Sequence, residues 1–298
     1  MSSIQSTLFR QIFHLFRKDW TTVEGFRRSL NRRETYHPPK QTKSRYRVHQ
    51  FEVSEYPVFT IKPKSMAHIN NRRLLYLHGG AYVHEMSPFH WRFAGKLTEA
   101  LGGTTVIPMY PLATATPASV TLSFVTDVYQ NLLRDADSND IVLIGDSAGG
   151  GMALALTQHI RNLGLPQPGH TLLFSPWLDV TLSHPEIQAS EARDPLLART
   201  GLLEAGKLYA GELDPRQPWV SPIYGSLTGL GPITIFYGTD ELILPDARQL
   251  VQQARADGVS IQAFEYPGMF HAWPIFPIPE ASKVIRQVEF YIKEARGD

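Results

Sequence analysis

One serine stands where a hydrophobic run meets a cluster of glycines. The run Ile141–Ile144 leads into Gly145-Asp-Ser147-Ala-Gly149, which fits the pattern G-x-S-x-G, and a helical stretch follows. In such a strand-to-helix turn the residues two before and two after the serine must be small, because the backbone passes close to its neighbours. The turn holds the hydroxyl at the edge of a sheet, in front of the N–H groups of the helix. Ser147 is therefore the candidate nucleophile, whereas a phosphate loop would need a Lys after the glycines.

A second hydrophobic run ends in the turn His-Gly-Gly-Ala at residues 78–81. A tight turn of this kind can direct several backbone N–H groups at one point. We expect the N–H groups of Gly79, Gly80 and Ala81, together with that of Ala148 after the serine, to form an oxyanion hole. Each donor of such a hole typically stabilises a transition state by about 2.7–4 kcal/mol.

The general base must be a histidine that can reach Ser147 in space. His271 is the one histidine after Ser147 that follows a late predicted strand directly, in a loop. His159 falls on a helix face, His170 in the turn before a strand, and His184 in a proline-rich stretch. We therefore expect His271 to take the proton from the serine.

The acid that orients this histidine is expected at the end of the predicted strand 233–237. Two adjacent carboxylates, Asp240 and Glu241, stand there. Neighbouring side chains at the end of a strand point in different directions, so only one of them should meet His271. The residues alone leave both open.

The chain after about residue 45 alternates short β-rich runs with helical stretches. Strands are predicted at 47–53, 58–62, 74–77, 104–109, 141–144, 171–174, 233–237 and 261–266, and helices at 90–100, 120–134, 150–162, 246–257 and 281–295. This alternation is typical of an α/β fold, with a mostly parallel eight-stranded sheet flanked by helices. The stretch 178–221 has no clear strand and contains four prolines. It predicts a helical lid insertion.

The N-terminal segment differs from the rest of the chain. Residues 1–50 contain 11 basic and 3 acidic side chains, a net charge of +8, although the whole chain has a net charge of +1. Apolar residues recur there at helical spacing: Ile4, Leu8, Ile12, Leu15, Phe16 and Trp20. We interpret 1–45 as an N-terminal helical lid segment and 46–298 as the core. Attachment of this basic helix to a membrane surface is the alternative.

Composition excludes several classes of protein. The 298 residues include 29 Lys plus Arg and 28 Asp plus Glu, so no nucleic-acid partner is expected. The chain has no Cys, which excludes disulfides and a thiol nucleophile. It shows no secretory signal pattern and no apolar stretch of about 18 residues that could span a bilayer. The sequence therefore predicts a cytoplasmic protein without membrane contact.

Together these motifs resemble the hormone-sensitive-lipase-like branch of the α/β-hydrolase carboxylesterases. The likeness runs from about residue 74 to 275 and includes Tyr110-Pro-Leu-Ala and Ser175-Pro-Trp-Leu-Asp, in the family's order. It implies a two-part lid over the site. Two departures stand out: Ala81 replaces the third glycine of the family's turn, and the acid is more often Asp. The family's spacing from Gly238 favours Glu241 over Asp240.

The resemblance and the residues together predict a serine carboxylesterase that hydrolyses small to medium acyl esters through an acyl-enzyme. Tyr82, Trp177 and Trp273 are expected to line its substrate pocket. No metal and no organic cofactor is expected. A lactonase or small-molecule deacetylase with the same triad is the alternative, and a non-catalytic ligand-binding protein is a more remote one. The natural ester and the oligomeric state, including a homo-oligomer, are left open.

Overall fold

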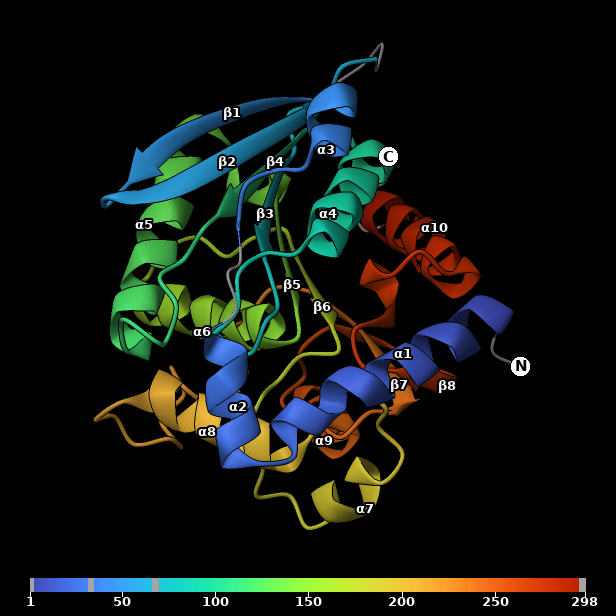
Figure 1. Cartoon of the computed structure of the whole chain (residues 1–298). Helices are drawn as coiled ribbons and strands as arrows, with labels where there is room; N and C mark the ends of the chain where they lie inside the picture. The colour runs from blue at the N-terminus through green and yellow to red at the C-terminus, as the bar shows by residue number, and fades with distance from the viewer. Residues whose placement is uncertain (1–2, 32–34, 66–69, 295–298) are drawn as a thin grey trace.

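The computed structural model describes residues 3–31, 35–65 and 70–294. Residues 1–2 and 32–34 of the predicted lid segment, and residue 295 of the last predicted helix, lie outside the described residues. Eight strands form one sheet in the order β1-β2-β4-β3-β5-β6-β7-β8 (Figure 1). The strands are β1 (Tyr46–Val53), β2 (Tyr56–Pro63), β3 (Arg73–Leu77), β4 (Thr104–Pro108), β5 (Ile141–Asp146), β6 (His170–Phe174), β7 (Ile233–Asp240) and β8 (Ile261–Phe270).

The sheet is parallel from β4 to β8 and antiparallel only where β2 pairs with β1 and β4. The central strands read as continuous apolar runs because both of their faces are covered. Along β3, for example, Leu75 and Leu77 enter one buried cluster, whereas Leu74 and Tyr76 enter the other. The predicted fold class, a mostly parallel eight-stranded α/β sheet flanked by helices, is confirmed.

Helices cover both faces of the sheet. The first cluster contains side chains of α5 (Ala118–Asp135), α6 (Ala148–Asn162) and α9 (Leu244–Ala256). The second contains side chains of α4 (Pro88–Leu101) and α10 (Pro279–Glu294). All five were predicted from periodicity within a few residues. Since β3, β5, β6 and β7 run parallel, their carboxyl ends meet at one edge of the sheet, and this edge carries the site.

The N-terminal segment contains α1 (Ile4–Trp20), α2 (Val23–Leu30) and α3 (Lys40–Arg45). The helical spacing of apolar residues predicted α1 and missed α3, a short helix that begins directly after Pro39. Both α1 and α2 contact α8 (Arg199–Ala210), which lies in the insertion between β6 and β7 with α7 (Ile187–Glu191) (Figure 1). These helices occupy the two segments expected to form the lid, and their lid role stays a prediction.

The sequence misjudged which face of α1 packs inward. Ile4, Leu8 and Leu15 of the expected apolar stripe are exposed, whereas Phe13 is buried. The ring of Phe13 packs against Phe270 and Phe276 at centroid distances of 5.1 and 4.9 Å. Phe13 packs inward because burial of its ring removes a large apolar area from water. Of the expected stripe, Trp20 is half-buried and packs against the core. Within the described residues no helix is both long and apolar enough to cross a membrane.

The packing of α1 predicts opposite outcomes for two substitutions on one helix. Phe13→Ala should lower the free energy of unfolding by about 3 kcal/mol, because it removes a buried ring that is 6% exposed. Leu15→Ala, at a side chain that is 66% exposed, should change it by less than about 0.5 kcal/mol. Urea denaturation of the two variants measures both effects. A larger loss for Leu15→Ala would show that α1 packs with its other face inward.

Candidate active site

Ser147 occupies the turn between β5 and α6 with a left-handed backbone, φ 52° and ψ −121°. Two backbone bonds hold it there: its N–H donates to the Phe174 carbonyl at 2.9 Å, and its carbonyl accepts from the Trp177 N–H at 2.8 Å. The flanking glycines are required by space. A Cβ on Gly145 would lie 2.1 Å from the Gly149 carbonyl oxygen, and one on Gly149 would lie 2.1 Å from that of Leu77. These contacts explain the G-x-S-x-G spacing physically.

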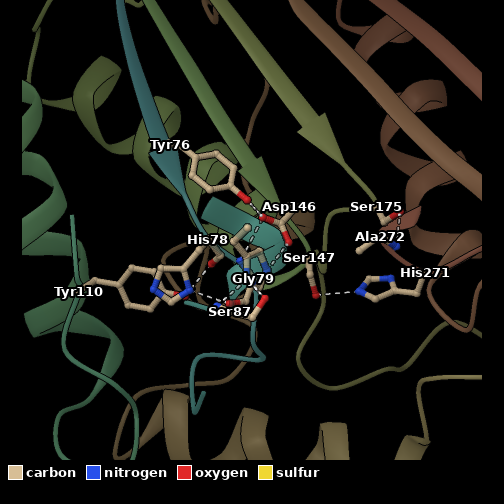
Figure 2. Close-up of polar contacts among 11 residues, drawn as sticks. Tyr76, His78, Gly79, Ser87, Tyr110, Asp146, Ser147, Ser175, His271 and Ala272 are labelled. Atoms are coloured by element: carbon tan, nitrogen blue, oxygen red, sulfur yellow. Dashed lines mark hydrogen bonds and ion pairs between the residues drawn. The ribbon is translucent and has the colours of Figure 1, made fainter. Parts of the chain in front are cut away.

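His271 follows β8 directly and turns its ring toward Ser147 (Figure 2). The distance from His271 Nε2 to Ser147 Oγ is 2.8 Å, and Nδ1 lies 3.2 Å from Glu241 Oε2. With Nδ1–H facing the carboxylate, Nε2 is the nitrogen free to accept a proton from the hydroxyl. The structure thus joins Ser147, His271 and Glu241 into one hydrogen-bonded chain.

The two adjacent carboxylates at the end of β7, Asp240 and Glu241, have separate partners. Glu241 is buried and meets His271, whereas Asp240 Oδ2 pairs with Arg10 Nη1 of α1 at 2.8 Å. The two side chains diverge because successive residues at the end of a strand point in different directions. The geometry therefore favours Glu241 over Asp240 as the partner of the imidazole.

Ser175 supports both the acid and the histidine. Its hydroxyl donates to Glu241 Oε1 at 2.7 Å. It also accepts the N–H of Ala272, the residue after His271, at 3.0 Å (Figure 2). The N–H of Gly238 donates to the same Oε1 atom at 2.6 Å. The sequence had singled out Ser175 only as part of a motif. Its contacts fix the carboxylate in the orientation that faces the ring.

The charges around His271 determine its proton affinity. Burial of the ring disfavours the imidazolium ion, but the hydrogen bond and charge of Glu241 favour it, as do the charges of Asp194 and Asp146. These negative charges outweigh burial and hold the pKa of His271 above its ordinary value. A proton taken from Ser147 would therefore be well held by this ring.

The turn at residues 78–81 contributes two of its expected oxyanion-hole residues to the wall of the site. Gly80 and Ala81 line the cavity in front of Ser147, and no hydrogen bond is described for their N–H groups or for that of Ala148 within the described part of the chain. The expectation that the Gly79 N–H helps to form the oxyanion hole was wrong, because this N–H donates to Asp146 Oδ1 at 3.2 Å. It therefore anchors the turn and is not free to bind an oxyanion.

Asp146 is the centre of a buried polar network that the sequence did not reveal. Besides the Gly79 N–H, its carboxylate accepts the Tyr76 hydroxyl at 2.5 Å (Figure 2). It also lies 3.2 Å from His90 Nε2. The Ser87 N–H donates to His90 Nδ1 at 3.0 Å, so Nε2 carries the proton that faces Asp146. A charged residue at the end of an otherwise apolar strand was the available signal. The network ties the 78–81 turn to the strand that carries the serine.

A cavity of about 260 Å³ opens in front of Ser147 and His271. Its wall is mainly apolar, and its large apolar side chains come from three parts of the chain: Phe16 and Trp20 of α1, Leu196, Leu197 and Leu202 of the insertion, and Ile275 and Phe276 after β8. Phe16 is also 53% exposed, so the cavity reaches the surface beside α1. Both segments expected to cover the site thus contribute to its wall.

The three aromatic residues expected in the pocket do not line this cavity. Tyr82 stacks on Tyr209 with ring centroids 3.6 Å apart. Trp177 donates through Nε1 to the Asp179 carbonyl, and Trp273 packs against Tyr266. Proximity in sequence to the turn, the serine and the histidine was misleading, because these rings fill the core behind the site.

The described residues contain no group of three His, Asp or Glu side chains arranged to hold a metal ion.

Known proteins share the sequence pattern and the fold of this chain. A family model described as the alpha/beta hydrolase fold matches residues 74–275. An acetyl-hydrolase of Streptomyces hygroscopicus is 32% identical over 77% of this chain and 78% of its own length. The LipR protein of Mycobacterium tuberculosis is 34% identical over 80% of this chain and 78% of its own. A crystal structure of a hormone-sensitive lipase from a metagenome library has a TM-score of 0.84 and 25% identity, and the match covers 97% of this chain and 98% of that chain.

The site geometry predicts the titration of His271 in nuclear magnetic resonance spectra. Its imidazole should titrate above the ordinary pH of about 6.5. Glu241→Gln should lower this pKa by about one unit or more, because an amide cannot stabilise the imidazolium ion. Asp240→Asn is the matched control and should shift it by less than about 0.3 unit, since Asp240 faces Arg10. A larger shift in Asp240→Asn would contradict the assignment of Glu241 as the partner.

Proposed function

The chain belongs to the α/β-hydrolase family and is a serine ester hydrolase, and we propose that it is a carboxylesterase acting on small to medium acyl esters through an acyl-enzyme. One observation carries the proposal. The hydrogen-bonded chain Ser147–His271–Glu241 opens onto an apolar cavity that Gly80 and Ala81 also line. A nucleophile, a base oriented by an acid, and donors for an oxyanion are the parts that acyl transfer needs.

In the first half of the proposed reaction, Ser147 Oγ attacks the ester carbonyl while His271 Nε2 removes its proton. Glu241 stays ionised and stabilises the imidazolium ion that forms. The carbonyl electrons move onto the oxygen, which the N–H groups of Gly80, Ala81 and Ala148 would bind as the oxyanion hole of this proposal. Collapse of this tetrahedral intermediate breaks the bond to the alcohol, which leaves with the proton from His271.

The second half repeats these steps with water. His271 removes a proton from the water molecule as its oxygen attacks the acyl carbon. Collapse of the second intermediate returns the proton to Ser147 Oγ and releases the carboxylic acid. Every proton is carried by one imidazole, so the enzyme returns to its starting state.

The cavity supports the proposed size of the substrate. At about 260 Å³ it is close to the lower end of small-molecule sites. Its apolar wall suits an acyl chain, and Phe16 of α1 and Leu202 of α8 form part of that wall. We therefore assign lid roles to the segments 1–45 and 178–221.

Hydrolysis of acetyl esters of small molecules is the second candidate, favoured by the name of the Streptomyces relative. It uses the same residues, so substrate preference alone separates it from the first.

Replacement of the nucleophile tests the proposed mechanism. Ser147→Ala should lower kcat on p-nitrophenyl butyrate about 10⁴- to 10⁶-fold, because the serine and histidine act as one unit. The thermal midpoint should change by no more than a few degrees. If more than a tenth of the activity remained, the assignment of Ser147 would be wrong.

Two neighbouring residues of α1 test its lid role. Phe16 lines the cavity, whereas Leu15 beside it does not, and more than half of each side chain is exposed. Phe16→Ala should raise KM for the hexanoate ester about 5-fold or more relative to acetate, because it removes apolar contact with the longer chain. Leu15→Ala should leave the ratio unchanged. Steady-state assays on esters from acetate to decanoate measure both, and equal profiles for the two variants would exclude the role of α1.

A further inference from the structure

Asp194 is a carboxylate in the insertion, between α7 and α8, that the proposed reaction does not use. Its side chain is 1% exposed. One oxygen, Oδ1, accepts the N–H groups of Leu196 at 2.8 Å and Leu197 at 2.9 Å. The other, Oδ2, accepts the N–H of Leu242 at 2.7 Å. The carboxylate therefore joins two segments that lie 48 residues apart in sequence.

A buried carboxylate is costly unless hydrogen bonds compensate for its lost hydration. Three backbone N–H groups do so here, and among the described residues no Lys or Arg forms an ion pair with Asp194. Its negative charge is thus held in place but not cancelled. An apolar residue would be the cheaper occupant of a position that only had to be filled.

The two segments joined by Asp194 both belong to the site. Leu242 directly follows Glu241, so its N–H is part of the loop that presents the acid to His271. Leu196 and Leu197 line the cavity. The Leu197 carbonyl accepts Arg17 Nε at 2.7 Å, which extends the connection to α1.

We propose that Asp194 is a positioning residue that holds the Glu241 loop against His271. It also fixes the cavity wall at Leu196 and Leu197 relative to that loop. This inference rests on the proposed function of the triad. The local bonds of Oδ1 shape the turn at Leu196 and Leu197, and the Oδ2 bond fixes that turn to the acid loop. Without the Oδ2 bond, Glu241 would retain Ser175 and Gly238 as partners on one oxygen but would lose the anchor on its C-terminal side.

Electrostatics gives Asp194 a second effect on the histidine. The charged groups that act on His271 are Glu241, Asp194 and Asp146, and all three favour the imidazolium ion. Removing the charge of Asp194 should therefore make His271 lose its proton at a lower pH. The acid limb of kcat/KM reports this change, because the base must be neutral to act.

Asp194→Ser separates the local hydrogen bonds of Oδ1 from the hydrogen bond between Oδ2 and the Leu242 N–H. A serine hydroxyl can still accept a local N–H and preserve the turn, but it has no second oxygen for Leu242. Asp194→Asn keeps one acceptor oxygen and turns an amide N–H₂ toward the Leu242 N–H. Asp240→Asn is the matched control, a neighbouring carboxylate of the same loop that pairs with Arg10 instead.

The test is a double-mutant cycle with Glu241→Gln, assayed on p-nitrophenyl butyrate. Titration with a serine-directed phosphonate counts the competent sites, so a partly unfolded variant still yields a kcat per site. Asp194→Ser should lower kcat about 10- to 100-fold in the wild-type background and less than about 3-fold in Glu241→Gln, because residues that act as a unit are not additive. In the wild-type background, Asp194→Ser should also move the acid limb of kcat/KM to lower pH. Asp240→Asn should stay within about threefold of wild type.

Equal losses of kcat in both backgrounds, or an unchanged acid limb, would show that Asp194 has only a structural role and would overturn the inference. Wild-type kcat in Asp194→Ser would overturn it too. The proposed function fails by a different result, the retention of activity in Ser147→Ala. The two failures are therefore distinguishable.

Discussion

The left-handed backbone of Ser147 is the constraint on which the rest of the structure depends. A non-glycine residue with φ of 52° is unfavourable by about 1–3 kcal/mol and persists only where its surroundings impose it. Here β5 pairs with β3 and β6 on either side, and bonds to Phe174 and Trp177 fix the turn itself. Because the glycines at 145 and 149 allow close approach, the hydroxyl stands at the sheet edge where β7 and β8 deliver the acid and the histidine.

Three buried carboxylates, Asp146, Asp194 and Glu241, surround the histidine. Backbone N–H groups, hydroxyls and, for Asp146, the ring of His90 hold them, and among the described residues none of the three forms an ion pair with a Lys or Arg. A cation would have cancelled their field, whereas neutral donors stabilise each charge and leave it free to act on His271. The same donors connect the Glu241 loop, the 78–81 turn and the cavity wall at Leu196 and Leu197. The neutral donors thus have two effects: they hold the groups of the site in place, and they preserve the negative charges that raise the proton affinity of His271.

The sequence predicted the sheet well because short β-rich apolar runs between helical stretches are typical of strands buried on both faces. It predicted the candidate nucleophile and histidine because glycine spacing and chain order constrain them. Periodicity could not choose between the stripes of Leu15 and Phe13 on α1, since that choice depends on the partner surface. Likewise, the occupied N–H of Gly79, the stacked ring of Tyr82 and the bridge from Asp194 depend on residues far away in sequence. Such contacts are tertiary, and no local pattern encodes them.

Covalent catalysis at Ser147 is the central claim, and trapping the intermediate tests it most directly. The wild-type enzyme would be mixed with p-nitrophenyl butyrate, quenched in acid within the first turnovers and digested for peptide mass spectrometry. The account predicts a butyryl group on the peptide that contains Ser147, formed together with a burst of p-nitrophenol. A butyryl group on another residue would contradict it. So would the absence of any acylated peptide under conditions where deacylation is rate-limiting.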